Sequence, residues 1–130
     1  MLVADAMLRA LVSEDSDLGR WALGRALEGE GFEVHAVLTW AEASAWLRRM
    51  ECDLVLAEVS SASEAIEVLG DVHRCAPGAH LVLLADEDTV DELRRACGPA
   101  PDVLAKPVDL EQLVYVALSR PARGGERLGG

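Results

Sequence analysis

Five short apolar segments are spaced along the chain, and each is bounded by polar or turn-forming residues. Phe32–Val37 alternates apolar and polar positions, which is typical of a strand near the edge of a sheet. Leu54–Glu58 is continuously aliphatic until its final carboxylate, which favours a strand covered by helices on both faces. The pattern therefore predicts five strands, at Leu8–Ser13, Phe32–Val37, Leu54–Glu58, His80–Ala85 and Val103–Ala105.

The segments between these strands carry signals for the start and end of helices. Thr39 and Glu42 form a T-x-x-E capping box, and Ser61 with Glu64 has the same spacing. A glycine or a proline follows most of the helical patterns and predicts their ends. The other predicted caps and stops are Ser16 or Asp17, Asp109 with Gln112, Gly29, Cys75 and Gly98.

Apolar residues three or four positions apart predict which side of each helix faces the sheet. The predicted inward residues are Ala22, Leu23, Ala26 and Leu27; Ala43, Trp46, Leu47 and Met50; Ile66 and Leu69; and Leu110, Leu113, Val114 and Ala117. Trp21 and Trp40 lie outside the main stripes, so they fit either exposed anchors for a partner or packing at the edge of the core.

The alternation of strands and helices predicts an α/β fold, a parallel sheet wound with helices on both faces. A chain of 130 residues fits one domain. We expect that domain to span residues 8–119. Residues 1–7 are expected to be an N-terminal extension with an alternative start at Met7, and residues 120–130 a flexible tail or linker.

Charge and composition narrow the classes of function. A net charge of −11 and a pI near 4.6 argue against direct nucleic-acid binding, which needs a basic surface. No apolar run is long enough for a membrane span and no secretion signal is apparent, so we expect a cytoplasmic protein. The three cysteines are widely spaced, and the histidines lack metal-ligand spacing, so a structural role is expected for both residue types.

Charged residues follow the predicted strands where parallel sheets gather their ligands. Glu14 and Asp15 follow the first strand, Glu58 ends the third, and Lys106, the sole lysine of the chain, follows the fifth. Three carboxylates at one sheet edge repel one another unless a cation lies among them. Either Lys106, a divalent ion, or both must therefore compensate their charge. The alternative, a lysine whose charge lies at the surface, is weaker because of the neighbouring acids.

The chain resembles a receiver domain of two-component response regulators from Leu8 to about Ser119. The motifs that carry the resemblance are LVSED, DLVLAEV, LVLLAD and DVLAKP. The resemblance implies a flavodoxin-like fold with strand order 2-1-3-4-5. It also implies that Glu14 and Asp15 match the acid pair that holds magnesium, and that Lys106 matches the family's lysine.

Three positions depart from the family pattern. Glu58 stands where the phosphoacceptor aspartate is found, Ala85 stands where a serine or threonine is found, and Val103 replaces the switch aromatic. The loop after the acceptor reads VSSAS and lacks the usual proline and glycine. These departures predict a pseudo-receiver that is not an enzyme, requires no cofactor and acts without phosphorylation, although Mg²⁺ at Glu14 and Asp15 is compatible with the pattern.

The expected function is binding of another signalling protein, and a homodimer is compatible with it. The resemblance implies a partner face made by Asp88–Cys97, Val103–Ala105 and Asp109–Ser119. The main alternative is a working phosphoryl-accepting regulator that uses Mg²⁺ at the acid pair. A flavin or nucleotide carrier is disfavoured because SEDSD places carboxylates where a phosphate would bind. No catalytic grouping supports a hydrolytic or redox enzyme.

Overall fold

The fold is a five-stranded parallel sheet in the order β2-β1-β3-β4-β5. The computed structural model describes residues 7–119. The predicted extension, apart from Met7, and the predicted tail lie outside the described residues. The elements are β1 (Arg9–Ser13), α1 (Asp17–Glu28), β2 (Glu33–Val37), α2 (Trp40–Leu47), β3 (Leu54–Glu58), α3 (Ala62–Cys75), β4 (His80–Asp86), a 3₁₀ turn (Glu87–Thr89), α4 (Val90–Cys97), β5 (Asp102–Lys106) and α5 (Leu110–Leu118). The predicted fold class and strand order are confirmed.

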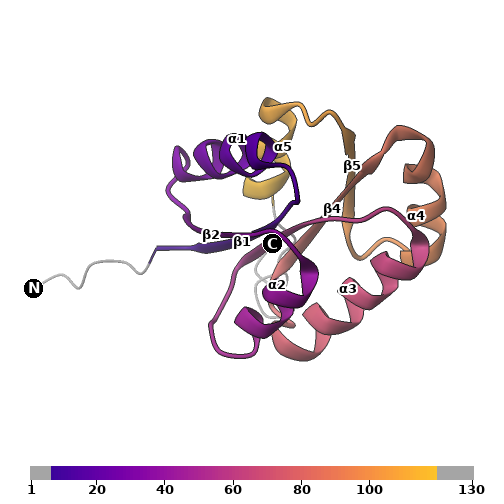
Figure 1. Ribbon diagram of the computed structural model, residues 1–130, viewed down its shortest axis with the longest axis horizontal. Coiled ribbons are helices and arrows are strands. Elements are labelled where there is room, and N and C mark those ends of the chain that lie inside the picture. Colours follow the sequence, from indigo (N-terminus) through magenta and orange to yellow (C-terminus); the bar gives the residue numbers. More distant parts are fainter. Residues whose placement is uncertain (1–6, 120–130) are drawn as a thin grey trace, which may run out of the picture.

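Helices cover both faces of the sheet, and each face has its own apolar core. Helices α1 and α5 lie on one face, while α2, α3 and α4 lie on the other (Figure 1). Because side chains alternate along a strand, neighbouring residues such as Leu11 and Val12 enter opposite cores. The central strand β3 is buried from Leu54 to Ala57, as its continuous apolar sequence predicts. Strand β2, at the edge, is largely exposed.

Side-chain caps begin four of the helices at the predicted residues. Ser16 accepts a hydrogen bond from the amide of Gly19, and Asp109 accepts from the amides of Glu111 and Gln112. Thr39 and Glu42 make the complete capping box. The second predicted box is only half formed: Ser61 caps the amide of Glu64, but the Glu64 carboxylate accepts from Ser60. Each cap stabilises its helix by about 1 kcal/mol.

Three residues predicted to face the sheet are exposed instead. Met50 is 36% exposed because α2 ends at Leu47, so Met50 lies beyond the helix. Ile66 is 53% exposed because α3 turns Ala65, Val68 and Val72 inward. Leu110, the first residue of α5, is 41% exposed. In α1, Ala22 and Ala26 are half-buried, while Gly24, which was not predicted, is buried.

Two histidines and one cysteine take structural positions, while His73 is exposed on α3. His80 is buried at the start of β4, where its Nε2 lies 2.6 Å from a carboxylate oxygen of Asp102. His35 stacks on Trp46 with ring centroids 4.9 Å apart. Burial raises the pKa of the Cys52 thiol to about 11, so that thiol is a poor nucleophile at neutral pH. Among residues 7–119, no helix is long and apolar enough to cross a membrane.

Candidate functional site

Strand alternation brings three charged side chains to one face of the sheet. The core beneath α1 and α5 receives Val12, Leu56 and Leu104 from the three strands β1, β3 and β5. Side chains two positions further along share that face. Those residues are Glu14, Glu58 and Lys106, at or just past the carboxyl ends of the strands. The sequence therefore predicted the cluster correctly, since parallel strands end at the same edge.

Lys106 compensates part of the negative charge of the carboxylates around it. Its Nζ donates to Glu58 Oε2 and lies 3.5 Å from Glu14 Oε1. Burial lowers the pKa of Lys106, but the hydrogen bond to Glu58 and the charge of Glu14 outweigh burial and raise it overall. The ammonium thus stays charged, and the alternative of a lysine lying free on the surface is wrong. The Lys106–Pro107 peptide bond that follows is cis.

Glu58 and Glu14 are shifted in opposite directions although they share this cation. Burial raises the pKa of Glu58, but hydrogen bonds from Lys106 and from the amide of Asp15, at 3.4 Å, lower it overall. Glu14 is only 2% exposed, and burial raises its pKa despite the 3.1 Å hydrogen bond from the amide of Ser16. Of these two acids, Glu58 therefore keeps its negative charge more firmly.

Two residues that sequence reasoning missed hold the loop after β1 in place. Arg20 donates through Nη1 to the carbonyl oxygens of Glu14 and Asp15, at 2.9 and 3.3 Å. Gly19 lies close to the Glu14 side chain, since a Cβ on Gly19 would lie 3.2 Å from Glu14 Cγ. Both residues belong to α1, and they reach the loop after β1 only because α1 packs back over it. Their sequence spacing carries no signal for this role.

The two remaining predicted positions are apolar and enclosed. Ala85 is 1% exposed and Val103 is 6% exposed, and both pack in the core on the face of α3 and α4. Ala85 lies one residue beyond Leu84, the β4 residue that pairs with Glu58. The carbonyl of Val103 accepts a 3.3 Å hydrogen bond from Arg94 of α4. Neither Leu84, which pairs with Glu58, nor Ala85 after it offers a side-chain hydroxyl on β4.

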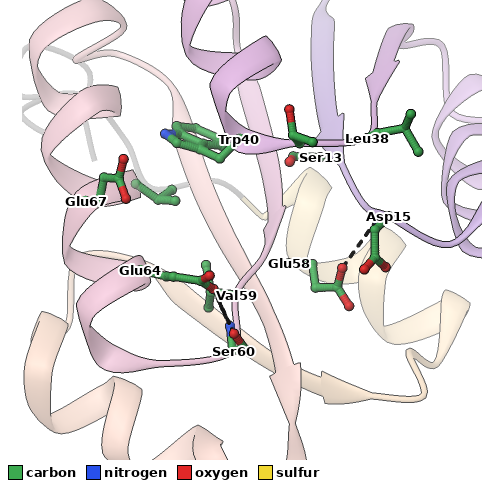
Figure 2. A pocket seen from close by; sticks show the side chains of 11 residues that line it. Ser13, Asp15, Leu38, Trp40, Glu58, Val59, Ser60, Glu64 and Glu67 are labelled. Carbon is green, nitrogen blue, oxygen red and sulfur yellow. Dashed lines mark hydrogen bonds between the residues drawn. The ribbon is translucent and has the colours of Figure 1, made fainter.

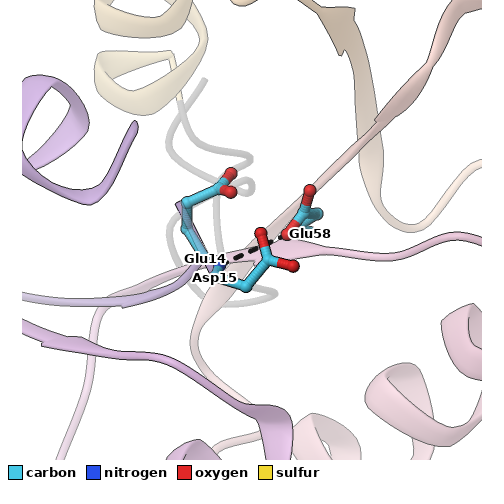
Figure 3. A group of neighbouring side chains, drawn as sticks. All are labelled: Glu14, Asp15 and Glu58. Atoms are coloured by element: carbon cyan, nitrogen blue, oxygen red, sulfur yellow. Dashed lines mark hydrogen bonds between the residues drawn. The ribbon is translucent and has the colours of Figure 1, made fainter. Parts of the chain in front are cut away.

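The acid pair and Glu58 form a group of oxygens that could hold a cation. One carboxylate oxygen from each of Glu14, Asp15 and Glu58 can be chosen so that all lie within 4.8 Å of one another. Figure 3 shows the consecutive Glu14 and Asp15 side chains diverging after β1, with Glu58 close to Asp15. Carboxylate oxygens suit a hard divalent ion, and the exposed Asp15 leaves access from solvent. Lys106 already supplies a positive charge to two of these acids.

Comparisons with solved structures decide the fold. No family model and no curated protein matches the sequence. A response regulator from Thermotoga maritima is 27% identical, with a TM-score of 0.66 over 85% of this chain and 93% of its own. This chain has the receiver-domain fold of two-component response regulators. A receiver protein from Sinorhizobium medicae WSM419 is 21% identical, with a TM-score of 0.75 over 87% of this chain and 92% of its own.

A third receiver-fold neighbour is described as an orphan response regulator. It comes from H. pylori, is 19% identical and has a TM-score of 0.72 over 83% of this chain and 91% of its own. Sequence identities at this level support the receiver fold. They do not show what chemistry the site performs, which has to come from the residues of this chain. The strand-end cluster of Glu14, Asp15, Glu58 and Lys106 therefore has to be interpreted from its own geometry.

Proposed function

We propose that this chain is a pseudo-receiver, a phosphorylation-independent module that binds another protein in cytoplasmic bacterial signal transduction. The observation that carries the proposal is the fixed ion pair between Glu58 and Lys106, next to a β4 position without a hydroxyl. A donor placed where negative charge develops stabilises phosphoryl transfer, and a hydroxyl at this β4 position would be such a donor. In this chain the acceptor position is already paired and the hydroxyl is replaced by a methyl group.

The length of Glu58 also supports the loss of phosphoryl transfer. Its carboxylate lies one methylene farther from the backbone than that of an aspartate, and a misplacement of about 1 Å can cost on the order of a hundredfold in rate. Val103 adds a second reason, because a buried valine in the core lacks a ring that could rotate between exposed and buried positions. Both changes favour a single resting state of the domain.

Partner binding is proposed for the face made by α4, β5 and α5. A groove of about 510 Å³ lies there, lined by Arg94 of α4, Val103 of β5 and Val116 of α5. On α5, Tyr115 is 72% exposed, which makes it available as an aromatic anchor. The occupant of this proposed face is a second signalling protein, or a second copy of the chain in a homodimer.

The decisive experiment is treatment with acetyl phosphate and Mg²⁺ followed by intact-mass spectrometry. We expect no added phosphoryl group on the wild-type chain. The double variant Glu58→Asp with Ala85→Thr should acquire some phosphorylation, because it restores the shorter acceptor and the hydroxyl. Labelling of Glu58 in the wild-type protein would overturn the proposal, and an inert double variant would contradict the account based on these two residues.

The second candidate is a regulator that still accepts a phosphoryl group and uses Mg²⁺. The close approach of the Glu14, Asp15 and Glu58 oxygens favours it. Bound there, the ion would neutralise charge on the transferring phosphoryl group, while Lys106 would hold its position beside Glu58. A magnesium titration followed by tryptophan fluorescence tests this candidate. Saturable binding together with labelling by acetyl phosphate would favour it over the pseudo-receiver.

A further inference from the structure

Strand β5 is an edge of the sheet, and every second residue of it directs its backbone away from β4. The amide of Val59 donates to the carbonyl of Leu84, so the backbone of Leu84 faces β3 and that of Leu83 faces β5. In a parallel ladder, Leu83 bonds to the residues on either side of its register partner, Val103. The N–H and C=O groups of Val103 therefore point outward, and so do those of Ala105 two positions later.

These outward groups are only partly covered. Arg94 of α4 donates a 3.3 Å hydrogen bond to the carbonyl of Val103. Among residues 7–119, no loop or side chain bonds to the N–H of Val103 or to the N–H and carbonyl of Ala105. An open strand edge is a template for a further strand, and a charged side chain laid over it is a common protection. The edge of β5 is therefore an open edge with one arginine across it.

The groove between α4 and α5 follows this edge. Its volume is about 510 Å³. It shares no lining residue with the hollow beside the charged cluster, in which Figure 2 shows Asp15 and Glu58. The groove is lined by Arg94, Gly98, Pro99, Pro101, Asp102, Val103, Leu104, Gln112 and Val116. A segment lying in the groove would thus run beside the outward backbone groups of β5.

The two walls of the groove differ in chemistry. On the α4 side, the Arg94 side chain is 61% exposed, and its nearest acid, Asp91, is 4.0 Å away. The other charged residue of the lining, Asp102, lies 2.6 Å from Nε2 of His80. On the α5 side, Val116 is half-buried and apolar. Because side chains of a strand alternate between the two faces of a sheet, an added strand would turn one set toward Arg94 and the other toward Val116.

We propose that the edge of β5 binds an extended segment of the partner protein as a sixth strand, with acidic side chains toward α4 and apolar side chains toward α5. Backbone hydrogen bonds supply affinity in this mode of recognition, and the alternating side chains supply specificity. An acidic side chain would draw Arg94 away from the carbonyl of Val103 and free that carbonyl for the partner's amide. The inference rests on the proposed function, because it names the kind of partner for the same face.

The test is an NMR titration of the whole chain with the acetylated and amidated peptide TVEVEVT, together with amide hydrogen exchange. We expect a Kd of about 0.1–1 mM, with shifts and slower exchange at the amides of Val103 and Ala105. The amide of Leu104 faces Leu83 and is the internal control, since it is already bonded in the free protein. A fully N-methylated version of the peptide keeps the side chains but loses the donors, so it should bind at least about tenfold more weakly.

A peptide of opposite charge separates the local effect of Arg94 from the charge of the whole chain. The net charge of −11 favours the lysine peptide TVKVKVT overall, so tighter binding of TVEVEVT isolates the groove. We expect a preference of about fivefold for the glutamate peptide, and Arg94→Glu should reverse it. Arg49→Glu is the matched control, because it makes the same charge reversal at an exposed position after α2 and should keep the preference. Circular dichroism confirms that both variants are folded.

Four results would overturn the inference. They are no binding up to about 5 mM, tighter binding of the lysine peptide, an equal effect of Arg49→Glu and Arg94→Glu, and a bound state in which Val103 and Ala105 exchange as fast as before. Protection of these amides that rises with protein concentration alone would make a second copy the occupant and would also overturn it. None of these results changes the outcome with acetyl phosphate, so the inference and the loss of phosphoryl transfer can each fail alone.

Discussion

At the residue scale, Lys106 decides the charge balance of the strand-end cluster. Its ammonium contacts Glu58 and Glu14, and no other basic side chain is within ion-pair distance of these two acids among residues 7–119. Removing one partner of a partly buried pair leaves the other charges uncompensated, which costs more than the pair itself contributes. The stability of the domain should therefore be sensitive to this one residue.

Replacing Lys106 with methionine should lower the free energy of unfolding by about 1–3 kcal/mol at pH 7. The side chain of Lys106 is 28% exposed, so solvent screening places the value toward the lower end. Urea denaturation measures it. Arg9→Met is the control, because the pair between Arg9 and Glu33 is exposed and should matter by less than about 0.5 kcal/mol. Equal losses in the two variants would contradict this account.

Glu14 and Glu58 should titrate on opposite sides of the usual glutamate pKa of 4.5. Burial raises the pKa of Glu14, so its contribution to stability is full below 4.5 and is lost as the pH rises through the folded-state value. Glu58 behaves in the opposite way, since its lowered pKa stabilises the fold above 4.5 and this stability is lost at lower pH. Carbon-detected NMR of the carboxyl groups measures both, and a reversed order would contradict the burial argument.

The direction of the Glu14 pKa shift can also be checked through the pH dependence of the free energy of unfolding. Glu14→Gln removes the cost of charging a buried carboxylate, so its stability relative to the wild type should be highest near pH 7 and should decline as the pH falls toward 4.5. Urea denaturation at several pH values follows the difference. A difference that is constant with pH would show that Glu14 is not shifted.

At the scale of the elements, one side-chain hydrogen bond joins α2 to α3. Trp40, the first residue of α2, donates to Asp71 of α3 at 2.8 Å, and Asp71 also pairs with Arg74 on its own helix. Asp71 is 8% exposed, so loss of the indole donor leaves a buried carboxylate oxygen without that partner. The bond therefore ties α2 to α3 on their shared face of the sheet.

Trp40→Phe should reduce the free energy of unfolding by about 1–2 kcal/mol, because the ring is kept while the donor is lost. Trp21→Phe is the matched control, since Trp21 is 62% exposed on α1 and its ring contacts Arg25 at the surface. The control should change stability by less than about 0.5 kcal/mol. Chemical denaturation compares the two, and a similar loss in both would argue against the link between α2 and α3.

Sequence patterns predicted the elements well and the exposure of individual residues less well. The bounds of β3 and the end of α3 at Cys75 match the prediction. The continuous apolar run defines the strand, and the proline that follows α3 disfavours a longer helix. Ile66 and Met50 were placed inward wrongly, since helical spacing does not reveal which of two adjacent stripes meets the sheet or that α2 ends early. Such details depend on how the helices lie against the sheet.

At the scale of the whole molecule, the parallel topology explains why the site could be predicted in part. Strands that run in the same direction end at one edge, so Glu14, Glu58 and Lys106 converge whatever the intervening helices do. The Arg20 contacts could not be predicted, because they depend on where α1 passes over the loop after β1. The sheet topology therefore determines which charged residues converge, and the packing of the helices determines which further residues contact them.

The net charge of −11 should make the stability of the whole domain depend on salt. Like charges repel in the compact state, and raising the ionic strength from about 0.01 M to about 0.15 M shortens the screening length from about 30 Å to about 8 Å. We expect the free energy of unfolding to rise with NaCl, as measured by urea denaturation. MgCl₂ at equal ionic strength separates screening from binding: an excess stabilisation that Asp15→Asn abolishes would assign an ion to the acid pair. No increase with NaCl would contradict self-repulsion as a significant cost to this fold.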